Sequence, residues 1–101
     1  MEIKKETFQL LKQFVKDLPE LQKIAKSLHK LDEMACNYRL TERQEKKQDE
    51  LIERAREIAK KYGFDVYHDG DPRACTLYLI TPEMKNEIGL PNYWEGIPII
   101  W

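Results

Sequence analysis

The sequence has little cysteine, little glycine and no long hydrophobic run. Its 101 residues include two cysteines, too few for a disulfide framework, and this favours a reducing compartment. The longest uncharged run is far below the ~20 residues of a membrane span, and the first residues lack the apolar core of a signal peptide. The four glycines form no phosphate-binding loop, and Ser27 is the single serine. We therefore expect a cytoplasmic globular domain without a membrane segment.

Neither sign of charge dominates. Seventeen basic and 18 acidic side chains give a net charge of −1, which argues against a polybasic nucleic-acid arm and against an acidic DNA mimic. The charge is unevenly distributed, however, because residues 1–63 carry a net +3 and residues 64–101 a net −4. All four glycines lie from position 63 onward. One domain over residues 1–101 is expected, with a helical part (1–63) and a β-rich part (64–101).

Apolar residues recur at helical spacing through the first part of the chain. A first helix is expected over residues 2–16, with Asp17 capping a second helix. The second helix carries a seam of apolar residues spaced three and four apart: Leu21, Ile24, Leu28, Leu31, Ala35 and Tyr38. A capping box at 41–44 predicts a break near Leu40, and a third helix ends at Gly63. We expect an antiparallel helical hairpin, and the alternative is one continuous helix over residues 19–62.

Beyond Gly63 the apolar period changes from helical to alternating. Strands are predicted over residues 64–68, 74–80 and 97–101, with turn chemistry at 69–73 and the start of a helical turn at 81–83. Pro98 confines the last strand to a sheet edge or a bulge. The predicted fold class is α+β, with the N-terminal helices, including the hairpin, packed on a small antiparallel three-stranded sheet.

Two stretches resemble a family of small uncharacterised bacteriophage and prophage proteins. They are Cys36–Tyr38 with the following Leu40–Gln44, and the hairpin motif Gly70-Asp71-Pro72-Arg73 that leads into Leu77–Leu79. At position 74 this chain has Ala where we expect Gly in the family. The resemblance implies a phage or prophage origin and a location in the bacterial host cytoplasm. It transfers no catalytic residue.

The loop from His68 to Arg73 contains the highest concentration of side chains that could bind a metal ion or an anion. His68, Asp69 and Asp71 could bind a divalent metal, and Arg73 is a candidate anion-binding residue, as in a metal-dependent nuclease. The structural interpretation, which we favour, makes both aspartates turn residues and Arg73 their partner. Cys75 could pair with His68 across the hairpin, but its parity with Leu77 and Leu79 favours a small buried hydrophobe. No metal, cofactor or catalytic residue is therefore expected.

Lysines on the first two helices raise a nucleic-acid hypothesis. Lys12 and Lys16 share one face, and Lys23, Lys26 and Lys30 share another. The surplus over local acidic residues is small and no arginine cluster accompanies it, so we favour a solvated face. A nucleic-acid-binding accessory protein remains the alternative function.

Aromatic residues concentrate on one predicted face of the sheet. Alternation directs Phe64, Val66, Cys75, Leu77, Leu79, Ile97 and Ile99 towards the helices. The opposite parity exposes Tyr67, Thr76, Tyr78, Ile80 and Ile100, with Tyr93 and Trp94 on a neighbouring loop. We predict a partner-binding site at Tyr67, Tyr78, Tyr93 and Trp94, because tyrosine and tryptophan dominate protein-binding hot spots. The favoured function is a non-enzymatic phage accessory protein that binds a host or host-defence protein. Two alternatives are that residues 81–96 cover this face and that the chain forms a homodimer there or through the 97–101 edge.

Overall fold

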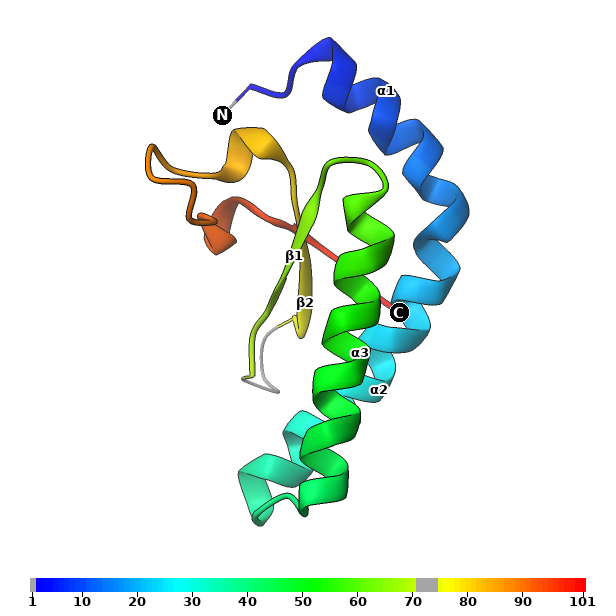
Figure 1. Cartoon of the computed structure of the whole chain (residues 1–101), viewed down its shortest axis with the longest axis vertical. Helices are drawn as coiled ribbons and strands as arrows, with labels where there is room; N and C mark the ends of the chain where they lie inside the picture. The colour runs from blue at the N-terminus through cyan, green and yellow to red at the C-terminus, as the bar shows by residue number, and fades with distance from the viewer. Residues whose placement is uncertain (1, 71–74) are drawn as a thin grey trace.

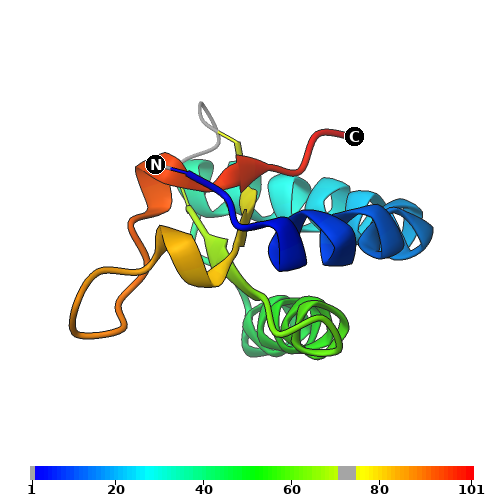
Figure 2. The same cartoon turned by 90° about the horizontal axis from the view of Figure 1, so that it is seen from above.

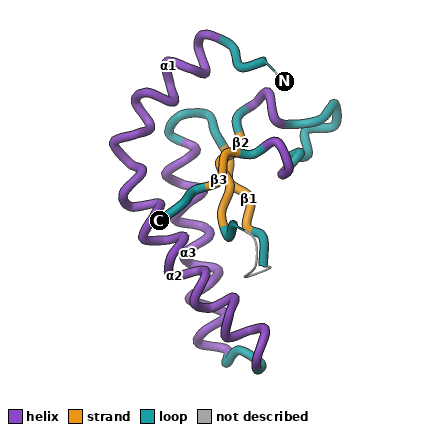
Figure 3. Tube along the Cα trace, turned by 180° about the vertical axis from the view of Figure 1, so that it is seen from behind, coloured by secondary structure: helices purple, strands orange, loops and turns teal. Residues whose placement is uncertain are grey.

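The computed structural model describes residues 2–70 and 75–101 of the chain. In this part of the chain, helices come first and a three-stranded antiparallel sheet follows (Figures 1 and 3). The α-helices are α1 (Lys5–Phe14), α2 (Leu18–Asn37) and α3 (Glu42–Lys60), and the strands are β1 (Asp65–His68), β2 (Leu77–Ile80) and β3 (Ile97–Pro98). Helix α3 packs against both α2 and β1. The predicted α+β class, with a helical pair beside a small antiparallel sheet, is confirmed.

The first two helices join differently from the prediction. Helix α1 begins at Lys5, and a 3₁₀ turn, η1 (Val15–Asp17), connects it directly to α2. The predicted cap at Asp17 is wrong, because its side chain makes no cap hydrogen bond. Its carboxylate instead accepts a hydrogen bond from the Tyr62 hydroxyl and lies 3.1 Å from Lys61 Nζ. The Asp17 carboxylate therefore binds groups at the end of α3 and not the backbone N–H groups at the start of its own helix.

The predicted helical hairpin is confirmed, and local chemistry defines both of its boundaries. Thr41 Oγ1 accepts a hydrogen bond from Gln44 N at 3.2 Å, and Gln44 Oε1 accepts one from Thr41 N at 2.9 Å. This capping box satisfies backbone groups at the start of α3 and excludes one continuous helix. At the other end Gly63 has a φ of 74°, and Phe64 N donates to the Ala59 carbonyl at 3.0 Å, which closes the helix in a Schellman motif.

The strands form a sheet with the order β1-β2-β3. Val66 lies opposite Leu79, and Tyr67 lies opposite Tyr78. Strand β2 begins at Leu77, later than predicted, and β3 comprises two residues in place of the predicted 97–101. Pro98 does lie in an edge strand, as expected for a residue without a backbone N–H. Beyond it, the Ile100 carbonyl accepts a hydrogen bond from Gln22 Nε2 at 2.7 Å, so the chain turns towards α2.

The main core lies between the helices and one face of the sheet, as the view in Figure 2 shows. Leu21, Leu28 and Ala55 of the hairpin are fully buried there. The predicted inward set of the sheet is confirmed for the residues that belong to or pack against this core: Phe64, Val66, Leu77, Leu79, Ile97 and Ile99. The predicted apolar seam of the second helix is wrong at its C-terminal end, because its last two residues are not buried. Ala35 and Tyr38 are exposed, because the tip of the hairpin extends past the sheet (Figure 1).

The segment between β2 and β3 lies on the side of the sheet away from α2 and α3 (Figures 1 and 2). It contains two short 3₁₀ turns, η2 (Pro82–Met84) and η3 (Tyr93–Glu95). Ile80, Thr81 and Met84 are buried here, outside the main core. The Glu83 carboxylate accepts hydrogen bonds from the Thr7 hydroxyl and from Lys4 N, which connects this segment to the start of α1. The segment therefore covers one end of the sheet's second face.

Among the described residues, none of the helices combines the length and the apolar composition that a membrane crossing requires.

Candidate functional site

Tyr67 and Tyr78 lie side by side on the second face of the sheet. They are directly opposite in the register of β1 and β2, and their ring centroids are 6.4 Å apart. Their neighbours Val66 and Leu79 point into the main core, so alternation directs the two tyrosines away from the helices. Both side chains are half-buried. This pair is the centre of the surface that the sequence predicts.

Trp94 lies in η3. The turn η3 packs against β2, and the Trp94 side chain is 69% exposed. The side chain of Tyr93, the fourth predicted residue, lies outside the part of the molecule that the structure describes. We refer to Tyr67, Tyr78 and Trp94 as the aromatic surface. Two strands and a turn distant in sequence supply it, so it depends on the folded sheet.

Three other residues that were predicted to be exposed on this face do not belong to the aromatic surface. Ile80 is fully buried, because the chain folds back at Pro82 and covers that end of the sheet. Thr76 is also fully buried, and its Oγ1 lies 3.4 Å from His29 Nδ1 of α2. It precedes the first residue of β2, so strand alternation does not determine its direction. Ile100 is exposed but lines a groove beside α1.

A buried polar network that the sequence analysis missed connects β1 to the helical hairpin. Asp32 of α2 is 2% exposed, and both of its carboxylate oxygens lie within hydrogen-bond distance of His68 Nε2, at 3.1 and 3.2 Å. Gln48 Nε2 of α3 donates to the same carboxylate at 3.1 Å. Burial raises the pKa of the Asp32 carboxyl, against the opposing influence of His68 and Gln48. The side chains of Asp32, Gln48 and His68 therefore link α2, α3 and β1.

This network changes the interpretation of the 68–73 loop. His68, the first residue of the candidate metal site, faces Asp32 in the described structure. Asp71 and Arg73 lie outside the described residues, so the anion-binding role of Arg73 stays a prediction. Within residues 2–70 and 75–101, His, Cys, Asp and Glu side chains form no group of three that could hold a metal ion.

The surroundings of the two cysteines do not indicate a catalytic thiol. Cys75 is half-buried, and its thiol donates to the carbonyl oxygens of Leu77 at 3.2 Å and Ile99 at 3.6 Å. These contacts favour the packing role over a pair with His68. Cys36 is exposed, because it lies near the tip of the hairpin.

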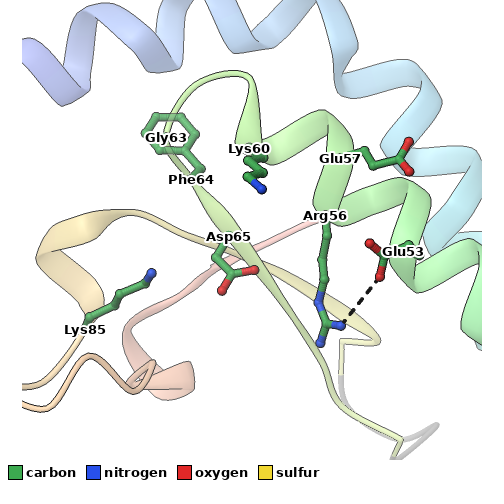
Figure 4. A pocket seen from close by; sticks show the side chains of 8 residues that line it. All are labelled: Glu53, Arg56, Glu57, Lys60, Gly63, Phe64, Asp65 and Lys85. Carbon is green, nitrogen blue, oxygen red and sulfur yellow. Dashed lines mark ion pairs between the residues drawn. The ribbon is translucent and has the colours of Figure 1, made fainter.

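A cleft of about 410 Å³ lies between the end of α3 and β1 (Figure 4). Three acidic and three basic side chains line it: Glu53, Glu57, Asp65, Arg56, Lys60 and Lys85. Arg56 Nη1 lies 4.0 Å from Glu53 Oε2. The formal charges of these six side chains balance, so the cleft has no excess of either sign that would favour an anion or a cation.

The chain matches no known protein family, no curated protein and no solved structure. The aromatic surface and the buried network are therefore interpreted from their own geometry.

Proposed function

We propose that the protein is a non-enzymatic binding module that recognises another protein through the aromatic surface. The observation that carries the proposal is the 69% exposure of Trp94 in η3, the turn that packs against β2, which is the strand of Tyr78. Such side chains bury a large area on binding at a low cost in conformational entropy. Hot spots are also enriched in tryptophan and tyrosine.

The charge around the aromatic surface indicates the chemistry of the partner. Residues 64–101 carry a net charge of −4, and Glu95 directly follows Trp94. This charge opposes the phosphate backbone of a nucleic acid and favours a protein with basic side chains around an apolar centre. The resemblance to phage and prophage proteins would make that partner a component of the bacterial host or of its defences.

The experiment compares proteins captured from a bacterial lysate by the immobilised full chain and by its variants. Trp94→Ala and Tyr78→Glu should each lose a protein that the wild type retains, because a hot-spot truncation costs at least about 2 kcal/mol of binding. Tyr38→Ala is the matched control, because Tyr38 is 65% exposed at the tip of the hairpin. Circular dichroism and thermal unfolding verify that each variant is folded.

Retention of every captured protein by Trp94→Ala and Tyr78→Glu would contradict the proposal. The same holds if Tyr38→Ala loses the partner equally, since binding would then not depend on this surface.

A further inference from the structure

A turn over residues 86–90 holds two aliphatic side chains in solvent. Asn86 Oδ1 accepts hydrogen bonds from the N–H groups of Ile88 at 3.1 Å and Leu90 at 3.0 Å. Asn86 N donates to the Leu90 carbonyl at 2.8 Å, and Gly89, with a φ of 82°, donates to the Asn86 carbonyl at 3.0 Å. Ile88 is nevertheless 78% exposed and Leu90 56% exposed. We call residues 86–90 the apolar turn.

The apolar turn is held in one conformation before any partner binds. Its backbone and the Asn86 side chain are already fixed by hydrogen bonds, so a partner would not have to order the turn. Preorganisation of this kind raises affinity by lowering the entropic cost of association. Adjacent exposed aliphatic side chains on an ordered turn are therefore a candidate contact.

An apolar groove of about 380 Å³ lies between α1 and β3. Leu11, Val15 and Leu18 line it on the helical side, and Pro98 and Ile100 line it on the side of the strand. Every lining residue is apolar, yet Val15 is 60% exposed and Ile100 is 69% exposed. The groove thus presents to solvent the kind of surface that the apolar turn could cover.

The two features are complementary in charge and separate in space. Lys12 and Lys16 follow Leu11 and Val15 of the groove, and both lysines are exposed. The exposed Glu87 precedes Ile88 of the turn. The segment that carries the turn, orange in Figures 1 and 2, lies on the far side of the sheet from α1. A chain therefore cannot fill its own groove with its own turn.

We propose that the chain associates head to tail, with the apolar turn of one copy seated in the apolar groove of a second copy. Glu87 then faces Lys12 and Lys16 of the neighbouring copy. Because the turn and the groove are different surfaces, each bound copy still offers one of them, and the contact extends into a chain of copies. The inference is independent of the proposed function, since it uses no residue of the aromatic surface.

Backbone pairing through the edge of β3 does not explain such an association. Ile99 N donates to the Leu77 carbonyl at 2.9 Å, so the backbone N positions of Pro98 and Ile100 face the outer edge. Proline has no N–H, and the Ile100 carbonyl already accepts a hydrogen bond from Gln22. The outer edge of β3 is therefore poorly suited to pair with a further strand. We infer that the copies associate by insertion of side chains of the turn into the groove.

The test uses sedimentation velocity of the full chain at low salt over a range of concentrations. The weight-average mass should rise with concentration and pass the value for a dimer. Ile88→Asp removes the turn contact, and Ile100→Asp removes the groove contact. Each should weaken self-association about tenfold or more, because a carboxylate would be buried in apolar surroundings. Both residues are largely exposed in the single chain, so each variant should unfold at nearly the wild-type temperature.

Mixing the two variants is the decisive measurement. Ile88→Asp retains an intact groove and Ile100→Asp retains an intact turn, so an equal mixture should form dimers and no larger species. Tyr38→Asp, at the tip of the hairpin, is the control and should associate like the wild type.

A wild-type chain that stays monomeric up to about 1 mM would overturn the inference, because even a Kd of 1 mM would be visible there. An assembly that stops at a dimer, or a mixture of variants that stays monomeric, would also overturn it. Loss of binding by Trp94→Ala in the capture experiment with head-to-tail assembly intact would show that the two proposals stand separately.

Discussion

His68 Nε2 lies 3.1 and 3.2 Å from the two carboxylate oxygens of Asp32, a residue 36 positions earlier in the chain. The pair connects the end of β1 to the C-terminal part of α2. Asp32 is almost completely buried, so the partners of its carboxylate decide whether burial is tolerated. Gln48 from α3 provides the other contact and brings the second helix of the hairpin into the same network.

Removal of the imidazole should destabilise the fold. We expect His68→Ala to lower the free energy of unfolding by about 1–3 kcal/mol, because a buried acceptor loses a partner. Asp32→Asn should cost less at neutral pH, since a neutral amide is less costly to bury than a carboxylate and its oxygen can still accept from Gln48. Urea denaturation of both variants provides the comparison. Lys30→Ala, at an exposed position of the same helix, is the control and should change stability by less than about 0.5 kcal/mol. Equal losses in His68→Ala and Lys30→Ala would argue against the network.

The capping box at Thr41 gives a second prediction. Thr41→Ala should lower the free energy of unfolding by about 0.5–2 kcal/mol, because the N–H of Gln44 loses its acceptor. Thr41→Ser keeps the hydroxyl and should retain most of the stability. Chemical denaturation measures both values. If the alanine and serine variants were equally stable, the hydroxyl would have no capping role.

Asp17 predicts a pH dependence of stability. The hydrogen bonds from Tyr62 and then Lys61 hold the pKa of the Asp17 carboxyl below its usual value of 3.8. A group with a lowered folded pKa contributes stability that is fully present above the unfolded pKa and is lost as the pH falls through the folded pKa. The unfolding free energies of wild type and Asp17→Asn should therefore differ at neutral pH and approach one another as the pH falls below the usual carboxyl value of 3.8.

Chemical denaturation from about pH 2 to pH 7 measures this difference. Tyr62→Phe removes the largest cause of the shift and should make the pH-dependent part of the difference smaller. A gap between wild type and Asp17→Asn that stays constant with pH would contradict the assignment.

The elements that the sequence predicted best are those with a local cause. The capping box at 41–44 and the positive φ of Gly63 involve residues within one or two helical turns of each other. Likewise, alternation in residues 64–68 and 77–80 placed Val66, Leu77 and Leu79 in the core. Such patterns can be recognised in a sequence because the backbone period of a helix or strand determines which side chains share a face.

The predictions that are wrong depend on contacts between distant elements. Asp17 has the composition of a helix cap, but the end of α3, over 40 residues later, provides Tyr62 and Lys61. Ile80 has the parity of an exposed residue, yet the following segment folds over it. In both cases a tertiary contact with a distant segment replaced the local preference.

The aromatic surface shows the same division. Alternation placed Tyr67 and Tyr78 on the second face, whereas the position of Trp94 depends on the packing of η3 against β2. The Asp32–His68–Gln48 network had no local signal, since its residues lie in three elements with no shared spacing.

The helical hairpin, the antiparallel strands and the inward face of the sheet could be predicted from local patterns, because hydrophobic periodicity and end caps act over a few residues. The packing of whole elements set where the hairpin extends past the sheet, which polar groups are buried together and which apolar groups face solvent. Arg54 illustrates the reason: its guanidinium donates to Glu20 of α2 at 2.8 Å, a partner 34 residues away. Such pairs depend on how whole elements pack, and packing is settled by the fit of their surfaces in three dimensions.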